Sequence, residues 1–197
     1  LLRRSRDYQS RVSTALAGQV LDALYELLRG FQSADDHTSR TLLKEYLDNN
    51  PDQIYGGLLS VLMRLVFLLY AEDQGLMPNT DLFARNYSLH GLFQRLRNEA
   101  EQFPDTMEHR YGAWPQLLAL FRAVYKGCQH PLIKMPAREG HLFDPDRYPF
   151  LEGRRLKTQG SEVATGEQQN DDKSTASTPS SLTPHLPLVP DGVVYRI

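Results

Sequence analysis

The segment spanning residues 58–78 constrains the fold most, because it is apolar on almost every side and carries one cation, Arg64. Its apolar runs are shorter than the roughly 20 residues that a bilayer-spanning helix needs, and Arg64 interrupts them. A helix that is apolar all round belongs in a protein core. Gly75 suits the left-handed position after a helix, and Pro78 blocks its continuation. The sequence therefore predicts a buried central helix from about residue 52 to residue 74, with no membrane partner.

The arginine in this helix needs an acceptor, because an unpaired buried charge is costly. Glu72 and Asp73 are the acids on the same helix. Residue 72 lies two turns from Arg64, so it can share a face with the arginine but not reach it directly. We assign Arg64, Glu72 and Asp73 to a structural polar network that fixes how helices dock, with further partners elsewhere in the chain. A contact between Arg64 and a neighbouring catalytic domain is the alternative.

Apolar residues at steps of three and four predict four further helices. The first ends near Gly30, needs a partner helix, and has this stripe: Val12, Leu16, Val20, Leu24, Leu27, Leu28 and Phe31. A short helix spans about 42–47, Ser88 caps a helix that runs through about residue 96, and the last runs from 114 to 125 with Gly127 at its end. Strand patterns are short, which favours an all-α class, an irregular multi-helix bundle. The predicted core includes Leu62, Leu65, Val66, Leu69, Phe93, Leu117 and Phe121.

The chain divides into four regions by composition. Residues 1–128 form the helical bundle, and residues 129–156, punctuated by Pro and Gly, form an ordered extended loop packed on it. Residues 157–181 are Ser, Thr, Gln and Asp rich, which predicts a disordered linker because few apolar groups offset the entropy of ordering. Residues 182–197 look like the start of a following helical segment, and the absence of an initial Met suggests a piece excised from a longer protein.

Charge and cysteine content limit the partners. A formal net charge of -2 gives no global attraction for nucleic acid, so DNA contact by this piece is weak at most. Two local groups are candidates for phosphate contacts, with ordinary solvated surface as the alternative: Arg3, Arg4 and Arg6, and Arg154 with Arg155. One cysteine, Cys128, excludes an intrachain disulfide, and no signal peptide is visible, so the cytoplasm is the expected location.

No motif in the sequence carries a reaction. A nuclease centre needs a carboxylate cluster with Glu-X-Lys, and the nearest match, Asp171-Asp172-Lys173, lies in the low-complexity segment. A methyltransferase needs a glycine-rich donor loop and an Asn-Pro-Pro-Tyr type motif, and neither occurs. His141 with Asp144 and Asp146 forms the densest polar group, more typical of turns than of a metal site. We predict no catalytic, cofactor-binding or metal-binding residue in this piece.

Several stretches resemble one family. They are Tyr-Ala-Glu-Asp-Gln-Gly-Leu-Met-Pro at 70–78, Asn-Tyr-Ser-Leu at 86–89, Gly-His-Leu-Phe-Asp-Pro at 140–145, Tyr-Pro-Phe-Leu at 148–151 and Asp-Gly-Val-Val-Tyr-Arg-Ile at 191–197. Together they resemble the helical connector that precedes the methyltransferase domain in large type IIG-like restriction-modification and phage-defence adenine-specific DNA methyltransferases. None of the stretches is a catalytic motif.

The resemblance implies a function for the chain and properties for its parent. The chain would be a noncatalytic helical connector or scaffold, flanked by a nuclease or other module upstream and the methyltransferase domain downstream. The parent would be an S-adenosylmethionine-dependent, adenine-specific DNA methyltransferase that contacts DNA, with a divalent metal where a nuclease is present. The alternative is a stand-alone helical protein-interaction module. A reading frame that continues past Ile197 into a glycine-rich turn and an Asn-Pro-Pro-Tyr motif would distinguish the connector from that module.

Overall fold

The computed structural model describes residues 2–154 and 185–197, with side chains from residue 14 onward in those ranges. The described chain is mostly helical with one small two-stranded sheet, which confirms the all-α class. The elements are α1 (Leu2–His37), α2 (Lys44–Asn49), α3 (Pro51–Asp73), α4 (Asp81–Asn86), α5 (Leu89–Gln102), η1 (Pro104–His109), α6 (Ala113–Lys126), β1 (Cys128–His130), β2 (Ile133–Met135), η2 (Pro149–Glu152) and α7 (Asp191–Arg196).

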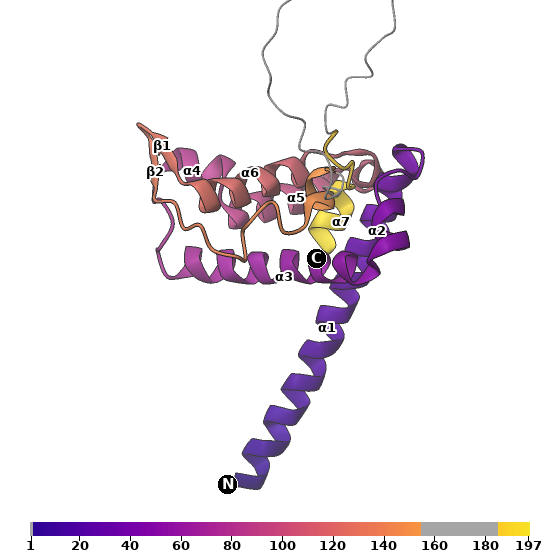
Figure 1. Cartoon of the computed structure of the whole chain (residues 1–197). Coiled ribbons are helices and arrows are strands. Elements are labelled where there is room, and N and C mark those ends of the chain that lie inside the picture. Colours follow the sequence, from indigo (N-terminus) through magenta and orange to yellow (C-terminus); the bar gives the residue numbers. More distant parts are fainter. Residues whose placement is uncertain (1, 155–184) are drawn as a thin grey trace, which may run out of the picture.

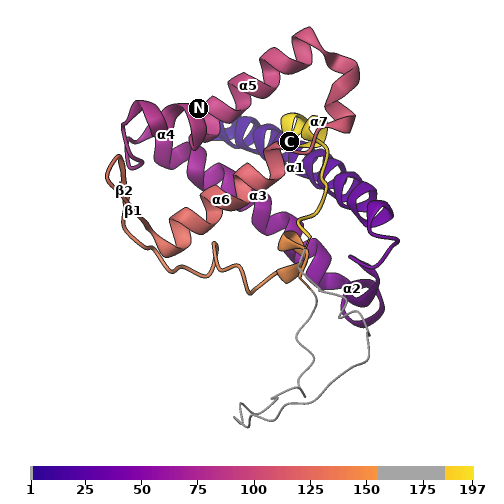
Figure 2. The same ribbon diagram turned by 90° about the horizontal axis from the view of Figure 1, so that it is seen from above.

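The helix α3 runs along one side of the body, with α4, α5 and α6 on the other side of the core (Figure 1). Only the C-terminal half of α1 joins this body, and its N-terminal half projects away from the other helices (Figure 1). Seen from above, α6 lies over α3 (Figure 2). The α3 helix packs against α1, α2 and α5. It buries Val61, Arg64 and Leu68 on one face and leaves Met63 and Val66 exposed on the other.

Aromatic rings from four separate elements form the centre of the core. Phe31 of α1 contacts Trp114 of α6 and Phe150 of η2 edge to face, with ring centroids 5.1 and 5.4 Å apart. Tyr46 of α2 meets Phe150 at 5.3 Å. All four rings are buried, and the Trp114 Nε1 donates a hydrogen bond to the Leu151 carbonyl at 3.1 Å. Edge-to-face packing of this kind stabilises the junction of α1, α2, α6 and η2.

Most predicted helix ends are confirmed. Helix α3 covers Pro51–Asp73, Gly75 has a φ of +66°, and the Ser88 hydroxyl accepts a hydrogen bond from the Gly91 N–H at the start of α5. The predicted end near Gly30 is wrong, because α1 continues to His37. Gly30 serves instead as a close-approach position: a Cβ there would lie 2.8 Å from a methyl of Val193 in α7.

The region after α6 contains a hairpin that the sequence did not predict. Strands β1 and β2 pair antiparallel, with Gln129 opposite Lys134. The following segment is an extended loop that buries Phe143, Phe150 and Leu151 against the helices. The three-residue strands are too short to show a period-two pattern in the sequence.

The C-terminal segment belongs to the same core as the bundle. Val189, Val193 and Val194 of the α7 region are buried, and α7 contacts α1, α5, η1 and α6. From the sequence we expected residues 182–197 to begin a following helical segment, but residues 185–197 pack into this bundle. The predicted linker at residues 157–181 lies outside the described residues.

The prediction of a core position is wrong for three residues. Leu62, Leu117 and Phe121 are buried and Leu65 is partly buried, as expected. In contrast, 62% of Val66, 49% of Leu69 and 44% of Phe93 is exposed. The error for α3 has a physical cause. A helix that is apolar all round can bury every side only when neighbours surround it, and α3 leaves one side exposed.

Candidate interaction surface

Arg64 is buried, with 3% of its surface exposed, and it contacts the loop that follows the hairpin. Its Nε donates to the Leu142 carbonyl at 2.6 Å and its Nη2 donates to the Asp144 carbonyl at 3.4 Å. The guanidinium carbon lies 5.2 Å from the ring centroid of Phe121 and 5.9 Å from that of Phe143. Arg64 therefore attaches residues 142–144 to α3 and α6 through hydrogen bonds and cation–π contacts.

Burial lowers the pKa of the Arg64 guanidinium to about 10, and the charges of Glu152 and Asp144 act in the opposite direction. The side chain keeps its charge at neutral pH. The partners of Arg64 lie elsewhere in the chain, as expected. They are the backbone carbonyls of Leu142 and Asp144, and no carboxylate accepts a hydrogen bond from Arg64 in the described residues.

The structure does not bring Arg64, Glu72 and Asp73 together. Glu72 instead accepts from the backbone N–H groups of Leu89 at 2.5 Å and His90 at 3.1 Å, at the start of α5. Asp73 accepts from the side chain of its neighbour Gln74 at 3.0 Å. Glu72 is thus a cap for another helix, where its negative charge meets unpaired donors.

A buried carboxylate with two arginine partners was missed by the sequence analysis. Glu152 is 6% exposed and accepts two hydrogen bonds from Arg122, at 2.8 and 2.9 Å. These bonds raise the pKa of Arg122. Arg154 pairs with the same carboxylate at 3.1 Å and also with Asp146. The cluster joins α6 to η2, and the only signal in the sequence was an acid directly after the apolar pair at 150–151.

The arginines predicted to contact phosphate fall in two separate places. Arg3, Arg4 and Arg6 lie on the projecting half of α1, and their side chains are outside the described set. Arg154 lies two residues after the end of η2, and Arg155 is outside the described residues. Because Glu152 and Asp146 balance the charge of Arg154, a phosphate contact there requires breaking existing ion pairs.

Within residues 2–154 and 185–197, no group of three or more His, Cys, Asp and Glu side chains is arranged to hold a metal ion. The Asp144 carboxylate accepts from the backbone N–H of Asp146 at 2.9 Å, a local turn bond.

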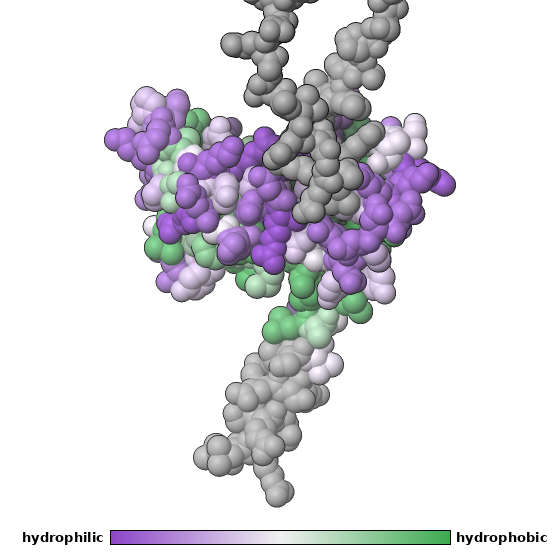
Figure 3. Space-filling view, in the orientation of Figure 1, coloured by the Kyte–Doolittle hydropathy of each residue, from purple (hydrophilic) through white to green (hydrophobic). Residues whose placement is uncertain are grey.

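The outward side of α3 carries a row of exposed apolar side chains. Met63, Val66 and Leu69 follow one another at steps of three, and Tyr70 lies four residues after Val66 on the same side of the helix. Between 49% and 62% of each residue is exposed. We call these four residues the outer α3 stripe. Green side chains gather along the lower edge of the body and where α1 leaves it (Figure 3). Contiguous apolar rows of this kind mark interaction surfaces.

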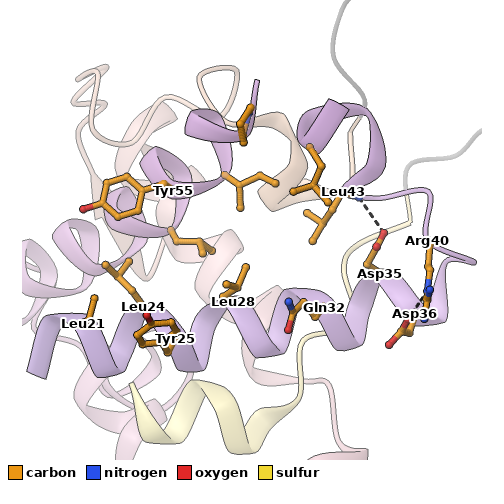
Figure 4. Close-up of a pocket in the computed structure, with 14 residues that line it drawn as sticks. Leu21, Leu24, Tyr25, Leu28, Gln32, Asp35, Asp36, Arg40, Leu43 and Tyr55 are labelled. Carbon is orange, nitrogen blue, oxygen red and sulfur yellow. Dashed lines mark hydrogen bonds and ion pairs between the residues drawn. The ribbon is translucent and has the colours of Figure 1, made fainter. Parts of the chain in front are cut away.

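An apolar groove of about 690 Å³ lies between α1 and the α2–α3 pair. One wall is formed by Leu21, Tyr25 and Leu28 of α1. The other wall contains Leu47 of α2 with Ile54 and Tyr55 of α3. Figure 4 shows Leu24 and Leu28 on the side of α1 that faces Tyr55 and Leu43 across this space. We call this space the α1–α3 groove.

One end of the α1–α3 groove is polar. Asp35, Asp36 and Arg40 line it there. The Asp35 carboxylate accepts from the backbone N–H groups of Leu42 and Leu43, at 2.9 and 3.0 Å, and fixes the turn that closes the groove (Figure 4). Asp36 and Arg40 form an ion pair at 3.0 Å. The groove therefore combines apolar walls with an acidic end.

By length and composition alone, α3 could cross a membrane: it has 23 residues and a window of mean hydropathy 1.9. In the fold, 44% of that window is buried, and core helices of other proteins pass the same test. The expectation of no membrane partner therefore stays a prediction.

Comparison of the chain with protein-family models, with curated proteins and with solved structures finds no match. The geometry of the outer α3 stripe and the α1–α3 groove therefore carries the functional argument.

Proposed function

We propose that this chain is a noncatalytic helical connector that packs against a neighbouring folded domain through the outer α3 stripe. Following the resemblance, the neighbour is the methyltransferase domain of an adenine-specific DNA methyltransferase or fused restriction-modification protein. The observation that carries the proposal is the exposure of Met63, Val66, Leu69 and Tyr70 in one row on a helix whose other face is in the core.

The stripe is large enough to matter energetically. Apolar area removed from water contributes roughly 25 cal/mol per Å², so four half-exposed side chains of this size contribute several kcal/mol when a partner covers them. Leaving them in water forfeits that free energy and invites aggregation. A neighbouring domain that covers the outer α3 stripe in the longer protein would remove this unfavourable exposure.

The rest of the fold holds the stripe rigid. The inner face of α3 buries Val61 and Leu68, and Arg64 attaches that face to the loop at 142–144. At the end of the helix, Glu72 fixes α5. A partner that docks on α3 therefore meets a preformed surface and loses little entropy in ordering it.

The proposal assigns the chemistry to the parent. S-adenosylmethionine, and a metal where a nuclease is present, bind other domains, and the cytoplasm is the expected location. Contact of this chain with DNA is weak and independent of sequence. The alternative function, a stand-alone helical interaction module, is favoured by the α1–α3 groove, which offers a second docking surface within the chain itself.

Two experiments test the proposal. Sequencing the full reading frame should find a glycine-rich turn and an Asn-Pro-Pro-Tyr motif downstream of Ile197, and a stop codon directly after Ile197 would contradict the connector assignment. Calorimetry of the 197-residue chain with S-adenosylmethionine should show no binding, with the full-length protein as the positive control. Saturable micromolar binding by the 197-residue chain would show that a donor site lies within it.

A further inference from the structure

The helix α1 supplies both a wall of the α1–α3 groove and a free apolar row. Leu21 and Tyr25 line the groove, while Leu16 and Val20, one turn apart on the projecting half, are 55% and 43% exposed. We infer that two copies of this chain associate about a two-fold axis, with the projecting half of each α1 seated in the α1–α3 groove of the other copy.

The dimensions of the groove fit one face of a helix. It follows α1 from Leu21 to Asp36, about 22 Å at 1.5 Å per residue. A helix of that length and ~10 Å diameter occupies roughly 1,700 Å³, well above the 690 Å³ of the groove. The groove therefore accepts the apolar side chains of a helix while the polar side of that helix stays in water, as in other helix-in-groove complexes.

The free row on α1 has the spacing that such a groove requires. Leu16 and Val20 lie at i and i+4, on the stripe that continues into the buried Leu24, Leu27 and Phe31. Recognition of a helix in a groove uses anchors at this spacing. Because the row and the groove belong to the same chain, a two-fold axis satisfies both copies at once, which makes the contact isologous and closed.

Charge selects the antiparallel direction. Residues 3–6 contain Arg3, Arg4 and Arg6, and the closed end of the groove carries Asp35 and Asp36 beside Arg40, so that end has an excess of one negative charge. Arg6 lies 14 residues before Val20, and Asp35 lies 14 residues after Leu21. When Val20 of one copy lies opposite Leu21 of the other, antiparallel helices bring the basic turns of one copy to the acidic end of the other.

The available area suits a dimer. Side chains exposed along the groove and the free row are Leu16, Val20, Leu21, Tyr25, Leu47 and Tyr55. At their exposed fractions they offer on the order of 700 Å² per copy, near the ~800 Å² per partner of a standard stable interface. Residues 157–181 of the same chain are a poor alternative filler, because Val163 is their only large apolar side chain.

Sedimentation equilibrium of the 197-residue chain over 1–100 μM, a range set by the ~μM affinities of modest interfaces, tests the inference. We expect a species of twice the 22.5 kDa chain mass. Leu16→Asp with Val20→Asp should weaken the dimer by at least about 100-fold, since charges would enter an apolar groove. Both positions are exposed, so far-ultraviolet circular dichroism should confirm an unchanged fold.

Leu132→Asp, at an equally exposed position in the turn of the hairpin, is the matched control and should leave the dimer intact. Asp36→Lys and Arg6→Asp should each weaken association, and the double variant should restore most of it. A wild-type chain that stays monomeric at about 100 μM, the highest concentration of the series, would overturn the inference. A dimer that persists in the Leu16→Asp, Val20→Asp variant would also overturn it, and so would a dimer that Val66→Gln abolishes. Neither result contradicts the connector proposal.

Discussion

Glu72, in the last turn of α3, accepts a hydrogen bond of 2.5 Å from the backbone N–H of Leu89, the first residue of α5. Its other carboxylate oxygen accepts from the His90 N–H and the Ser88 hydroxyl, at 3.1 and 3.2 Å. One carboxylate thus satisfies two of the unpaired donors at a helix N-terminus, at the position where the helix dipole favours negative charge. Glu72 thereby fixes the direction in which α5 leaves the loop after α3.

We expect Glu72→Ala to lower the free energy of unfolding by about 1–2 kcal/mol, because the α5 donors lose their acceptor. Asp73→Ala is the matched control. Asp73 accepts a hydrogen bond from the exposed side chain of its neighbour Gln74, and its removal should change stability by less than about 0.5 kcal/mol. Urea denaturation of both variants provides the measurement. Equal effects of the two substitutions would contradict the capping role of Glu72.

The Arg64→Leu substitution should destabilise the chain by about 1–3 kcal/mol, because the partly buried Leu142 carbonyl loses its donor. Replacing a buried ion pair can leave stability nearly unchanged when both partners are side chains and both are replaced by apolar groups. Here the acceptor is main chain and stays in place. Thermal melts of Arg64→Leu beside Phe67→Leu, a change on the same helix at a half-exposed site, test this. An Arg64→Leu variant as stable as the wild type would contradict the attachment of the loop to α3.

Asp191 gives a prediction for pH. Its carboxylate is buried and accepts from the Ala113 N–H at 2.7 Å, and burial raises its pKa above the ordinary value. A raised folded-state pKa means that the charged form destabilises the fold, and this cost disappears as the pH falls through that pKa. Asp191→Asn keeps an acceptor without the charge, so it should melt above the wild type at pH 7, and the difference should shrink toward pH 4.

Asp191→Ala provides the control, because it removes the acceptor altogether. It should lose about 1 kcal/mol at pH 7, the usual cost of a lost helix cap. Melting curves from pH 4 to pH 7.5 separate the two effects. An Asn variant that is less stable than the wild type throughout this range would show that the charge of Asp191 stabilises the fold.

The sequence predicted the helices well because their signals are local. The Ser88 cap, Gly75 and the stripe from Trp114 to Tyr125 each depend on neighbours within a turn or two. The surroundings of α3 could not be predicted in the same way. Periodicity shows that Val66 and Leu69 are apolar, but whether another element covers them depends on residues far away in the chain.

The candidate site shows the same limit. The need of Arg64 for an acceptor could be predicted from its apolar context, but not the identity of Leu142, because any residue supplies a backbone carbonyl. Gly30 was interpreted as a helix end, since a glycine needed for the approach of α7 looks the same in sequence as a glycine after a helix. The ion cluster at Glu152 depends on Arg122 and Arg154, which no spacing rule connects.

Substitutions on the outer α3 stripe should separate folding from docking. Val66→Gln with Leu69→Gln should shift the melting temperature of the 197-residue chain by less than about 2 °C, because exposed positions contribute little to stability. In the full-length protein the same pair should lower the melting temperature by about 4 °C or more, since the covered stripe would then hold unpaired polar groups. A large loss in the 197-residue chain would show that the stripe is part of the core.

Hydroxyl-radical footprinting of the outer α3 stripe tests the central claim most directly. Oxidation of Met63 and Tyr70 should be strong in the 197-residue chain, where both are more than half exposed, and should fall at least about fivefold in the full-length protein. Phe103 and Tyr87, exposed on other elements, serve as internal controls and should react equally in both proteins. Equal oxidation of Met63 and Tyr70 in the two proteins would show that no neighbouring domain covers α3 and would contradict the connector function.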